Sequence, residues 1–212
     1  MALVTPQEWK LSTGTAWMLS PGDAPLTRSF ILAAAGGTGK TDYTAFRDGV
    51  DHSSYSLLDA LHERSRSLIL IGYDDGTAGL ANLAKAVTET VQRALAQRVG
   101  SAPLVAGGIG RGALAARYGL VKLENMRFAH GTAVYYSYNG TSPTQQEAGE
   151  LHDMGEWPQL PRLFGLASEE FTNELDFDLD KGPFDDTTTG ARNPGGPLIT
   201  SELGSWLLDR LP

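Results

Sequence analysis

The segment Gly108-Ile109-Gly110-Arg111-Gly112 constrains the fold of this chain more than any other feature. An apolar run at 103–106 precedes it, and residues 113–124 after it have the apolar spacing of a helix. The pattern predicts a sharp turn from a strand into a helix. When the central residue of such a turn is Ser, its hydroxyl is exposed and the next backbone N–H faces a developing oxyanion. Here the central residue is Gly110, which has no side chain that could attack.

Apolar runs alternate with helical segments along the rest of the chain. Buried strands are predicted at 29–34, 67–72, 103–106, 133–138 and 161–167, and amphipathic helices at 79–99 and 201–211. This alternation predicts an α/β fold with a mostly parallel twisted sheet, helices on both faces, and ligands at the carboxyl ends of the strands. The stretch from Trp9 to Leu19 predicts one or two antiparallel edge strands. We expect a single domain over 1–212, in which the acidic, Gly- and Pro-rich region 169–197 is a surface excursion.

Composition excludes several classes of function. The chain has 17 basic and 25 acidic residues and a formal charge of -8, so a nucleic acid would be repelled. It has no cysteine, which excludes disulfides, thiolate metal sites and a cysteine nucleophile. The first nine residues lack a basic and then apolar leader pattern, and no apolar run is long enough to span a bilayer. We therefore expect a soluble, cytoplasmic protein without a membrane partner.

Four blocks of sequence occur in an order that resembles the bacterial serine esterase and lipase-like members of the α/β-hydrolase superfamily. The blocks are 31–33 with the Gly-rich loop after it, 68–74, 107–112 with 116–118, and 157–162. The resemblance covers about residues 28 to 167 and implies a minimal hydrolase fold without a large lid, because the connection from Tyr138 to Pro161 is short. An open cleft, or one covered by a partner in a homo- or hetero-oligomer, is expected.

The chain departs from this family at the catalytic positions. The nucleophilic Ser of the family corresponds to Gly110, and its His should lie ahead of the last helix, where residues 193–197 read Asn-Pro-Gly-Gly-Pro. All four histidines come earlier, at His52, His62, His130 and His152. A nucleophile and its base must lie within hydrogen-bond reach, so ordinary acyl-enzyme hydrolysis is not expected.

Five residues are predicted to bind the ligand: Ala35, Gly36, Tyr73, Gly110 and Arg111. The resemblance places one oxyanion-type N–H at Ala35 or Gly36 and the other at Arg111. Two explanations of Gly110 stay open. Glycine relieves backbone strain once nucleophilicity is no longer selected, or its missing side chain makes room for a ligand over the Arg111 N–H.

Four residues at strand ends are candidate catalytic groups: Asp74, Tyr138, Asn139 and Glu169. Asp74 would act as a general base if it is desolvated, whereas the neighbouring Asp75 has the position of a helix cap. Tyr138 and Asn139 could hydrogen-bond a carbonyl or enolate, with strand packing as the alternative for Tyr138. Glu169 follows the last predicted strand, where hydrolases often keep the triad acid, and its alternative is a solvated surface charge.

No cofactor or metal is predicted. The Gly39-Lys40-Thr41 triplet fits a phosphate loop poorly, because Ala34 stands where the motif requires Gly. Segment 176–187 imitates a calcium loop, but its Gly comes one position late and Thr187 replaces the final Glu. The histidines lack zinc-site spacing.

The leading hypothesis is a hydrolase-fold protein that binds a small, largely apolar organic molecule and promotes a non-hydrolytic step in specialised metabolism, such as proton transfer, dehydration or ring closure. The biosynthetic setting is an analogy with other uses of this fold. The alternative is a catalytically inactive scaffold or regulatory partner of an active homologue. A third hypothesis, hydrolysis through a displaced Ser168 or Thr38, is weaker because neither residue lies on an elbow turn.

Overall fold

The computed structural model describes residues 6–22, 24–171 and 182–212. Its main strands are β1 (Gln7–Lys10), β2 (Gly14–Leu19), β3 (Ser29–Ala33), β6 (Ser67–Tyr73), β7 (Leu104–Ile109), β8 (Thr132–Tyr138), β9 (Arg162–Ser168) and β10 (Asp186–Gly190). They form one sheet in the order β1-β2-β6-β3-β7-β8-β9-β10. Strand β2 pairs antiparallel with β1 and β6, and the pairs from β6 to β10 are parallel. The predicted parallel sheet and its antiparallel edge are both confirmed.

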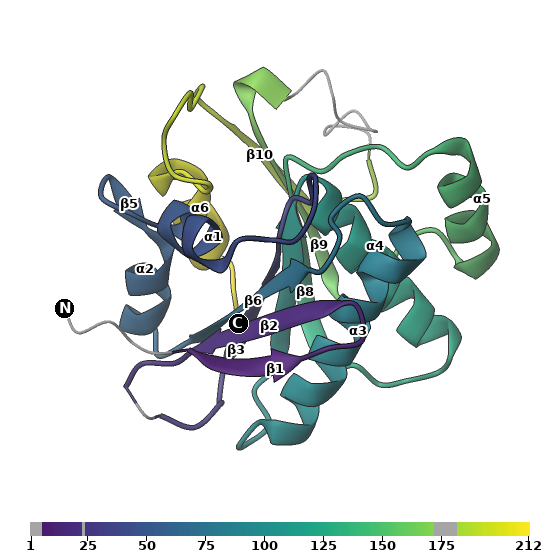
Figure 1. Cartoon of the computed structure of the whole chain (residues 1–212), viewed down its shortest axis with the longest axis horizontal. Coiled ribbons are helices and arrows are strands. Elements are labelled where there is room, and N and C mark those ends of the chain that lie inside the picture. Colours follow the sequence, from purple (N-terminus) through teal and green to yellow (C-terminus); the bar gives the residue numbers. More distant parts are fainter. Residues whose placement is uncertain (1–5, 23, 172–181) are drawn as a thin grey trace.

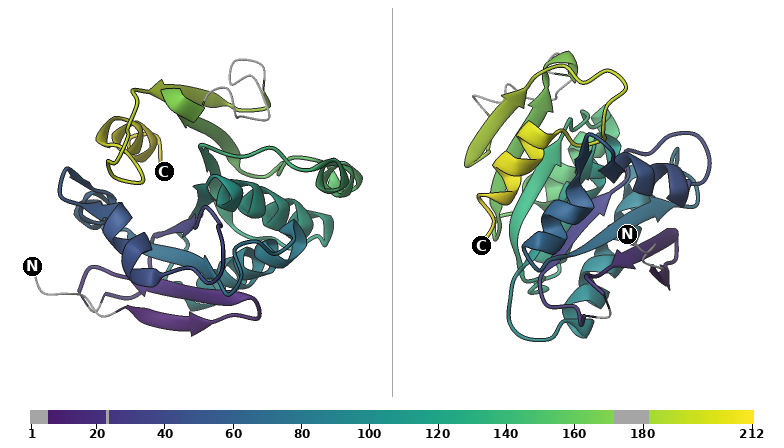
Figure 2. Two further views of the ribbon diagram at one scale, coloured as in Figure 1. Left: turned by 45° about the horizontal axis from the view of Figure 1, so that its top comes forward. Right: turned by 90° about the vertical axis from the view of Figure 1, so that its left-hand side faces the viewer.

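Helices cover both faces of this sheet (Figures 1 and 2). On one face α3 (Leu80–Gln97) packs against α4 (Arg111–Asn125), and α5 (Gln145–Met154) lies beside α4. The other face carries α1 (Tyr43–Val50), α2 (Leu57–Glu63) and α6 (Ser201–Leu208), with a two-stranded hairpin of β4 (Asp51–His52) and β5 (Tyr55–Ser56). A short 3₁₀ helix, η1 (Glu169–Phe171), follows β9. Because both faces are covered, every residue of β3, β6 and β7 is buried.

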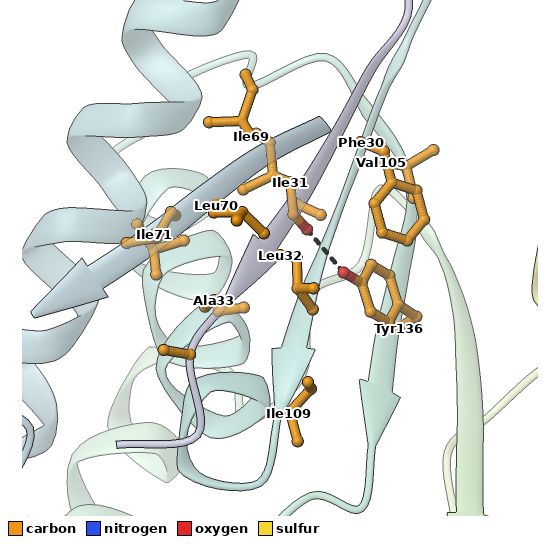
Figure 3. Packing of buried hydrophobic residues seen from close by; sticks show 14 of the residues in the cluster. Phe30, Ile31, Leu32, Ala33, Ile69, Leu70, Ile71, Val105, Ile109 and Tyr136 are labelled. Carbon is orange, nitrogen blue, oxygen red and sulfur yellow. Dashed lines mark hydrogen bonds between the residues drawn. The ribbon is translucent and has the colours of Figure 1, made fainter. Parts of the chain in front are cut away.

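The centre of the sheet is packed from four neighbouring strands (Figure 3). Ile31 and Leu32 of β3 lie between Ile69 and Leu70 of β6 and the side chain of Tyr136 from β8. The Tyr136 hydroxyl donates to the Ile31 carbonyl oxygen over 2.9 Å, and burial raises the pKa of Tyr136 well above its ordinary value. This core fixes the carboxyl ends of β3, β6, β7 and β8 relative to one another.

One sequence prediction about the fold is wrong. Region 169–197 was expected to be a surface excursion, yet residues Asp186–Gly190 form β10, which pairs in parallel with β9. Its sequence, Asp-Thr-Thr-Thr-Gly, has no apolar run, because β10 is an edge strand with mostly half-exposed residues. The connection from β8 to β9 carries α5 as its helix, in agreement with the expected absence of a large lid. Within the described ranges, the helices are too short or too polar to cross a bilayer.

Candidate functional site

Gly110 lies between β7 and α4 in the conformation that an elbow turn requires. Its φ is 52° and its ψ is -121°, a combination that residues with a Cβ rarely adopt. The Gly110 N–H donates to the Tyr138 carbonyl oxygen at the end of β8 over 2.9 Å. The predicted strand–turn–helix junction is therefore present at the carboxyl edge of the sheet.

The three glycines of this turn differ in what surrounds them. A Cβ on Gly108 would lie 2.5 Å from the Gly112 carbonyl carbon, and a Cβ on Gly112 would lie 2.2 Å from the Ala34 carbonyl oxygen. These two positions admit only glycine, because backbone meets backbone there. A Cβ on Gly110 would have the Ala35 Cβ as its nearest neighbour, at 3.6 Å, which is ordinary van der Waals contact. Space for a side chain therefore exists at Gly110, and only its backbone angles oppose one.

The loop after β3 lies directly beside the elbow. The Ala35 side chain would contact a Cβ placed on Gly110. Gly36 has a φ of 86°, and a Cβ placed on it would lie 3.4 Å from the Arg111 side chain. The N-cap residue of α4 is Gly110, which has no side chain to cap the helix. The first N–H groups of a helix have no intrahelical acceptor and carry a partial positive charge. Ala35, Gly36, Gly110 and Arg111 thus meet at one place, around the amino end of α4.

The guanidinium group of Arg111 is engaged by α5. Its Nη1 donates to Glu147 Oε2 over 3.0 Å, and its Nη2 bonds Glu147 Oε1. Chiefly through this contact, the pKa of Glu147 falls to about 2. Glu147 also accepts from the Thr144 N–H and so completes a capping box at the start of α5. Sequence reasoning missed Glu147, although the Thr-x-x-Glu spacing of residues 144–147 is a cap signal.

Tyr73 and Asp74 lie at the carboxyl end of β6 in contrasting environments. Tyr73 is fully buried, its hydroxyl has no hydrogen-bond partner in the described part of the chain, and burial raises its pKa. Asp74 has a side chain that is 57% exposed, 3.9 Å from the Lys40 ammonium. The desolvation that a general base at Asp74 needs is therefore missing. Asp75 acts as a local cap, accepting from the Thr77 N–H over 2.9 Å.

Tyr138 and Asn139 end β8 and hold adjacent loops. The buried Tyr138 hydroxyl accepts from the Thr200 N–H, just before α6, over 3.3 Å. Asn139 has a φ of 48°, and its Oδ1 accepts from the Ser168 N–H over 2.8 Å. Its Nδ2 donates to Ser168 Oγ over 3.3 Å. Both side chains therefore have partners within the chain, and Ser168 is fastened to Asn139.

The two glutamates after β9 face the loop that follows β10. The Glu169 side chain is 64% exposed and lies 3.8 Å from Arg192 Nε. Glu170 accepts from the Asn193 N–H over 3.1 Å, and its second carboxylate oxygen is buried without a partner in the described ranges. Sequence reasoning chose Glu169, whereas its neighbour Glu170 is the one with a buried oxygen. Because the two glutamates are adjacent and identical, the sequence could not show which of them would be buried.

The remaining sequence motifs are accounted for locally. Thr41 Oγ1 accepts from the Tyr73 N–H and the Thr41 N–H donates to the Tyr73 carbonyl, both over 2.9 Å, so this loop extends the pairing of β6. Half of the calcium-like segment, residues 176–181, lies outside the described residues. The histidines occupy β4, α2, the loop before β8, and α5. His130 is fully buried and bonds Glu124 over 3.1 Å.

No protein-family model and no curated protein sequence matches this chain. Solved structures do resemble it. A lipase/esterase from Lactobacillus plantarum aligns with a TM-score of 0.57 at 12% identity, over 98% of this chain and 99% of the other. An esterase from Pyrobaculum calidifontis aligns with a TM-score of 0.56 at 9% identity, over 88% of this chain and 75% of the other.

The enterobactin esterase of Shigella flexneri aligns with a TM-score of 0.53 at 15% identity. The alignment covers 99% of this chain but only 58% of the esterase, so the chain spans little more than half of that protein. Likeness at such low identity concerns the fold alone. The chain has the α/β-hydrolase-like fold of these esterases and lipases.

Proposed function

We propose that this protein has lost nucleophilic hydrolysis, binds a small, largely apolar organic molecule over the elbow, and promotes a non-hydrolytic step such as proton transfer, dehydration or ring closure. One observation carries the proposal. Gly110 keeps the strained angles of the elbow, with φ 52° and ψ -121°, while the space for its side chain is open. The close backbone contacts of Gly108 and Gly112 hold the turn on either side of this open position.

The ligand oxygen would be held by backbone groups. The amino end of α4 and the Ala35–Gly36 loop adjoin the open position, and we assign their N–H groups the binding of a carbonyl or enolate oxygen. Glu147 neutralises the Arg111 guanidinium, so this site offers dipoles rather than a free cation. That arrangement favours a neutral carbonyl compound, whose charge develops only during reaction.

We assign proton transfer in this proposal to the accessible carboxylates Asp74 and Glu169. Tyr138 and Asn139 are assigned the walls of the site, because their hydrogen bonds hold the loops before α6 and after β9. If a ligand excludes water from Asp74, its carboxylate becomes a stronger base. Substituting Asp74 or Glu169 with the corresponding amide should then abolish turnover while leaving ligand binding in place.

Two measurements test the proposal. A fluorophosphonate probe and generic aryl esters should neither label the protein nor be hydrolysed, and labelling at Ser168 or Thr38 would overturn the loss of nucleophilic catalysis. A crystal soaked with metabolite extract should show an organic molecule over the Arg111 N–H. Binding of extract components elsewhere, with the elbow empty, would contradict a ligand site at Gly110.

The second candidate is an inactive scaffold or regulator of an active homologue. It is favoured by the internal pairing of polar groups near the elbow, namely Arg111 with Glu147, Asn139 with Ser168, and Tyr138 with Thr200. Under this alternative, adding the protein to an active hydrolase of the same fold should change its stability or kcat. The elbow should then stay empty in metabolite-soaked crystals.

A further inference from the structure

The carboxylate of Glu147 connects the starts of two helices. Its Oε2 accepts from the Thr144 N–H over 2.9 Å and from Arg111 Nη1 over 3.0 Å, and its Oε1 bonds Arg111 Nη2. Arg111 is the first residue of α4, and Thr144 is the N-cap residue of α5. Among the ten residues of α5, Glu147 and Leu151 are buried, so little apolar packing fixes this helix. The Arg111–Glu147 ion pair is therefore a principal contact between α5 and α4.

The loop that joins β8 to α5, residues 139–144, lies against the elbow. The Thr141 N–H donates to the Gly110 carbonyl oxygen over 3.4 Å, which is long for a hydrogen bond. The loop ends at Thr144, whose N–H is bound by Glu147. Because the contact at Thr141 is weak, the place of this loop beside the elbow depends on how firmly its far end is held.

The side chain of Arg111 also meets the loop after β3. A Cβ placed on Gly36 would lie 3.4 Å from Arg111 Cβ and 3.5 Å from its Cγ, so the arginine stem lies directly against this loop. The same loop contacts the turn after β6, where the Gly76 N–H donates to the Gly39 carbonyl oxygen over 2.8 Å. The conformation in which Arg111 reaches Glu147 is therefore the one in which its stem supports the loop after β3.

We propose that Arg111 and Glu147 are positioning residues of the elbow site, and that their ion pair holds the loops after β3 and β8 in place around Gly110. The inference rests on the proposed function, in which these two loops adjoin the ligand. A guanidinium group that binds both oxygens of a carboxylate fixes the orientation of its partner as well as its distance. The two side chains are 25% and 11% exposed, so solvent and salt screen their charges only weakly.

Hydrogen exchange of backbone amides, measured by NMR on the full chain without ligand, tests the inference. The Thr141 amide reports on the loop after β8, and the Gly76 amide, which donates to Gly39, reports on the loop after β3. Glu147→Gln removes the ion pair but keeps a residue type that completes a capping box. It should speed the exchange of both amides by about tenfold, the factor that corresponds to one lost charged hydrogen bond.

Three control variants separate this role from other effects, and each should leave the Gly76 amide at the wild-type rate. Thr144→Ala breaks the capping box but leaves the ion pair in place. Tyr118→Phe removes a different contact between α4 and α5, the hydrogen bond to Glu150. Tyr136→Phe removes a hydrogen bond of the core, away from both loops, and so controls for a general loss of stability.

A double-variant comparison tests whether the two residues act as one unit. Arg111→Gln should match Glu147→Gln, and the combined variant should exchange no faster than either single one. Arg111→Lys, which keeps the charge but not the paired donors, should lie between wild type and Arg111→Gln and replaces that variant if it does not fold. Additive effects, or a Gly76 amide that exchanges at the wild-type rate in Glu147→Gln, would overturn the inference.

This outcome is separate from that of the proposed function, because the exchange is measured without ligand. Faster exchange of both amides in Glu147→Gln supports the positioning role whether or not an organic molecule binds at the elbow. An empty elbow in metabolite-soaked crystals contradicts the proposed ligand site and leaves the exchange result standing.

Discussion

The backbone angles of Gly110, and not the space around it, determine how much stability is lost when a side chain is added there. Gly110→Ser would place its Cβ no closer than 3.6 Å to any neighbour, at a φ of 52°. We expect the variant to fold with a loss of about 1–2 kcal/mol, the usual cost of a left-handed residue with a Cβ. Urea unfolding measures this loss. Gly110→Ala should lose a similar amount, because it has the same strain without the hydroxyl.

The same pair of variants tests the catalytic side of the site. Neither should hydrolyse aryl esters, because the loop after β10 offers Asn193 and no histidine to deprotonate a hydroxyl. Ester hydrolysis by Gly110→Ser, but not by Gly110→Ala, would show that a base lies near the elbow. It would also show that glycine at this position is the only barrier to hydrolysis.

Glu147 gives the elbow a pH dependence whose direction is fixed by its partner. The Arg111 contact lowers the pKa of Glu147 from 4.5 to about 2 in the folded state. A lowered carboxyl pKa stabilises the fold above pH 4.5, and this stabilisation is lost as the pH falls towards 2. We expect Glu147→Gln to reduce stability at pH 7 by roughly 1–3 kcal/mol, as for a lost charged hydrogen bond.

The diagnostic measurement is the difference in unfolding free energy between wild type and Glu147→Gln as a function of pH. This difference should shrink as the pH is lowered from 5 to 2, because protonated Glu147 resembles Gln. Asp153→Asn, at an exposed position of the same helix, serves as the control. A difference that does not change with pH would mean that Glu147 acts through packing alone.

At the scale of elements, the junction of β7 with α4 depends on two close backbone contacts. Gly108→Ala and Gly112→Ala each force a Cβ to within 2.5 Å of main-chain atoms. We expect losses of about 1–3 kcal/mol or more, as for overpacked cores. Gly149→Ala in α5 is the matched control, because nothing lies within 4 Å and a helix prefers Ala by about 1 kcal/mol. Chemical denaturation of the three variants checks this order, and equal stabilities would contradict it.

The sequence predicted best those strands that are buried on both faces, because their residues are apolar throughout. Runs such as Leu68–Ile71 are apolar because helices cover both faces of the sheet. The elbow turn was predicted from its alternating glycines between a strand and a helix. Strand β10 was not predicted, because its threonines lie at the edge of the sheet, where a strand can pair without an apolar face. The sequence also does not show which of two adjacent residues, such as Tyr73 and Asp74, is buried and which is exposed. Tyr73 is buried and Asp74 exposed, and that difference depends on tertiary packing.

At the scale of the whole molecule, the sheet has two chemically different edges. The carboxyl edge combines uncharged dipoles around Gly110 with internally paired side chains, whereas at the amino edge Arg28 and Arg66 both bond the Pro212 oxygen. Between the two edges, β3, β6 and β7 contribute mostly apolar side chains, all of them buried. The core therefore separates the polar contacts at one edge from those at the other.

The stability of both edges rests on the packing of β8 across β7 onto β3. The Tyr136 ring stacks on Phe30 with 4.8 Å between centroids, and its hydroxyl reaches Ile31, because Gly107 of β7 leaves room for it. A Cβ on Gly107 would lie 2.6 Å from the Tyr136 ring. Tyr136→Phe removes the buried donor and should cost about 1 kcal/mol. Tyr43→Phe, at a half-buried hydroxyl on α1, should change stability by less than about 0.5 kcal/mol.

Urea unfolding followed by tryptophan fluorescence and by circular dichroism measures both variants. The two signals should coincide for Tyr136→Phe, with a lower midpoint and an unchanged slope, because the sheet unfolds as one cooperative unit. Separate transitions would show that β8 to β10 unfold independently of β3, and that the sheet does not couple its two halves. Equal midpoints for Tyr136→Phe and Tyr43→Phe would show that the hydroxyl bond to Ile31 does not stabilise the core.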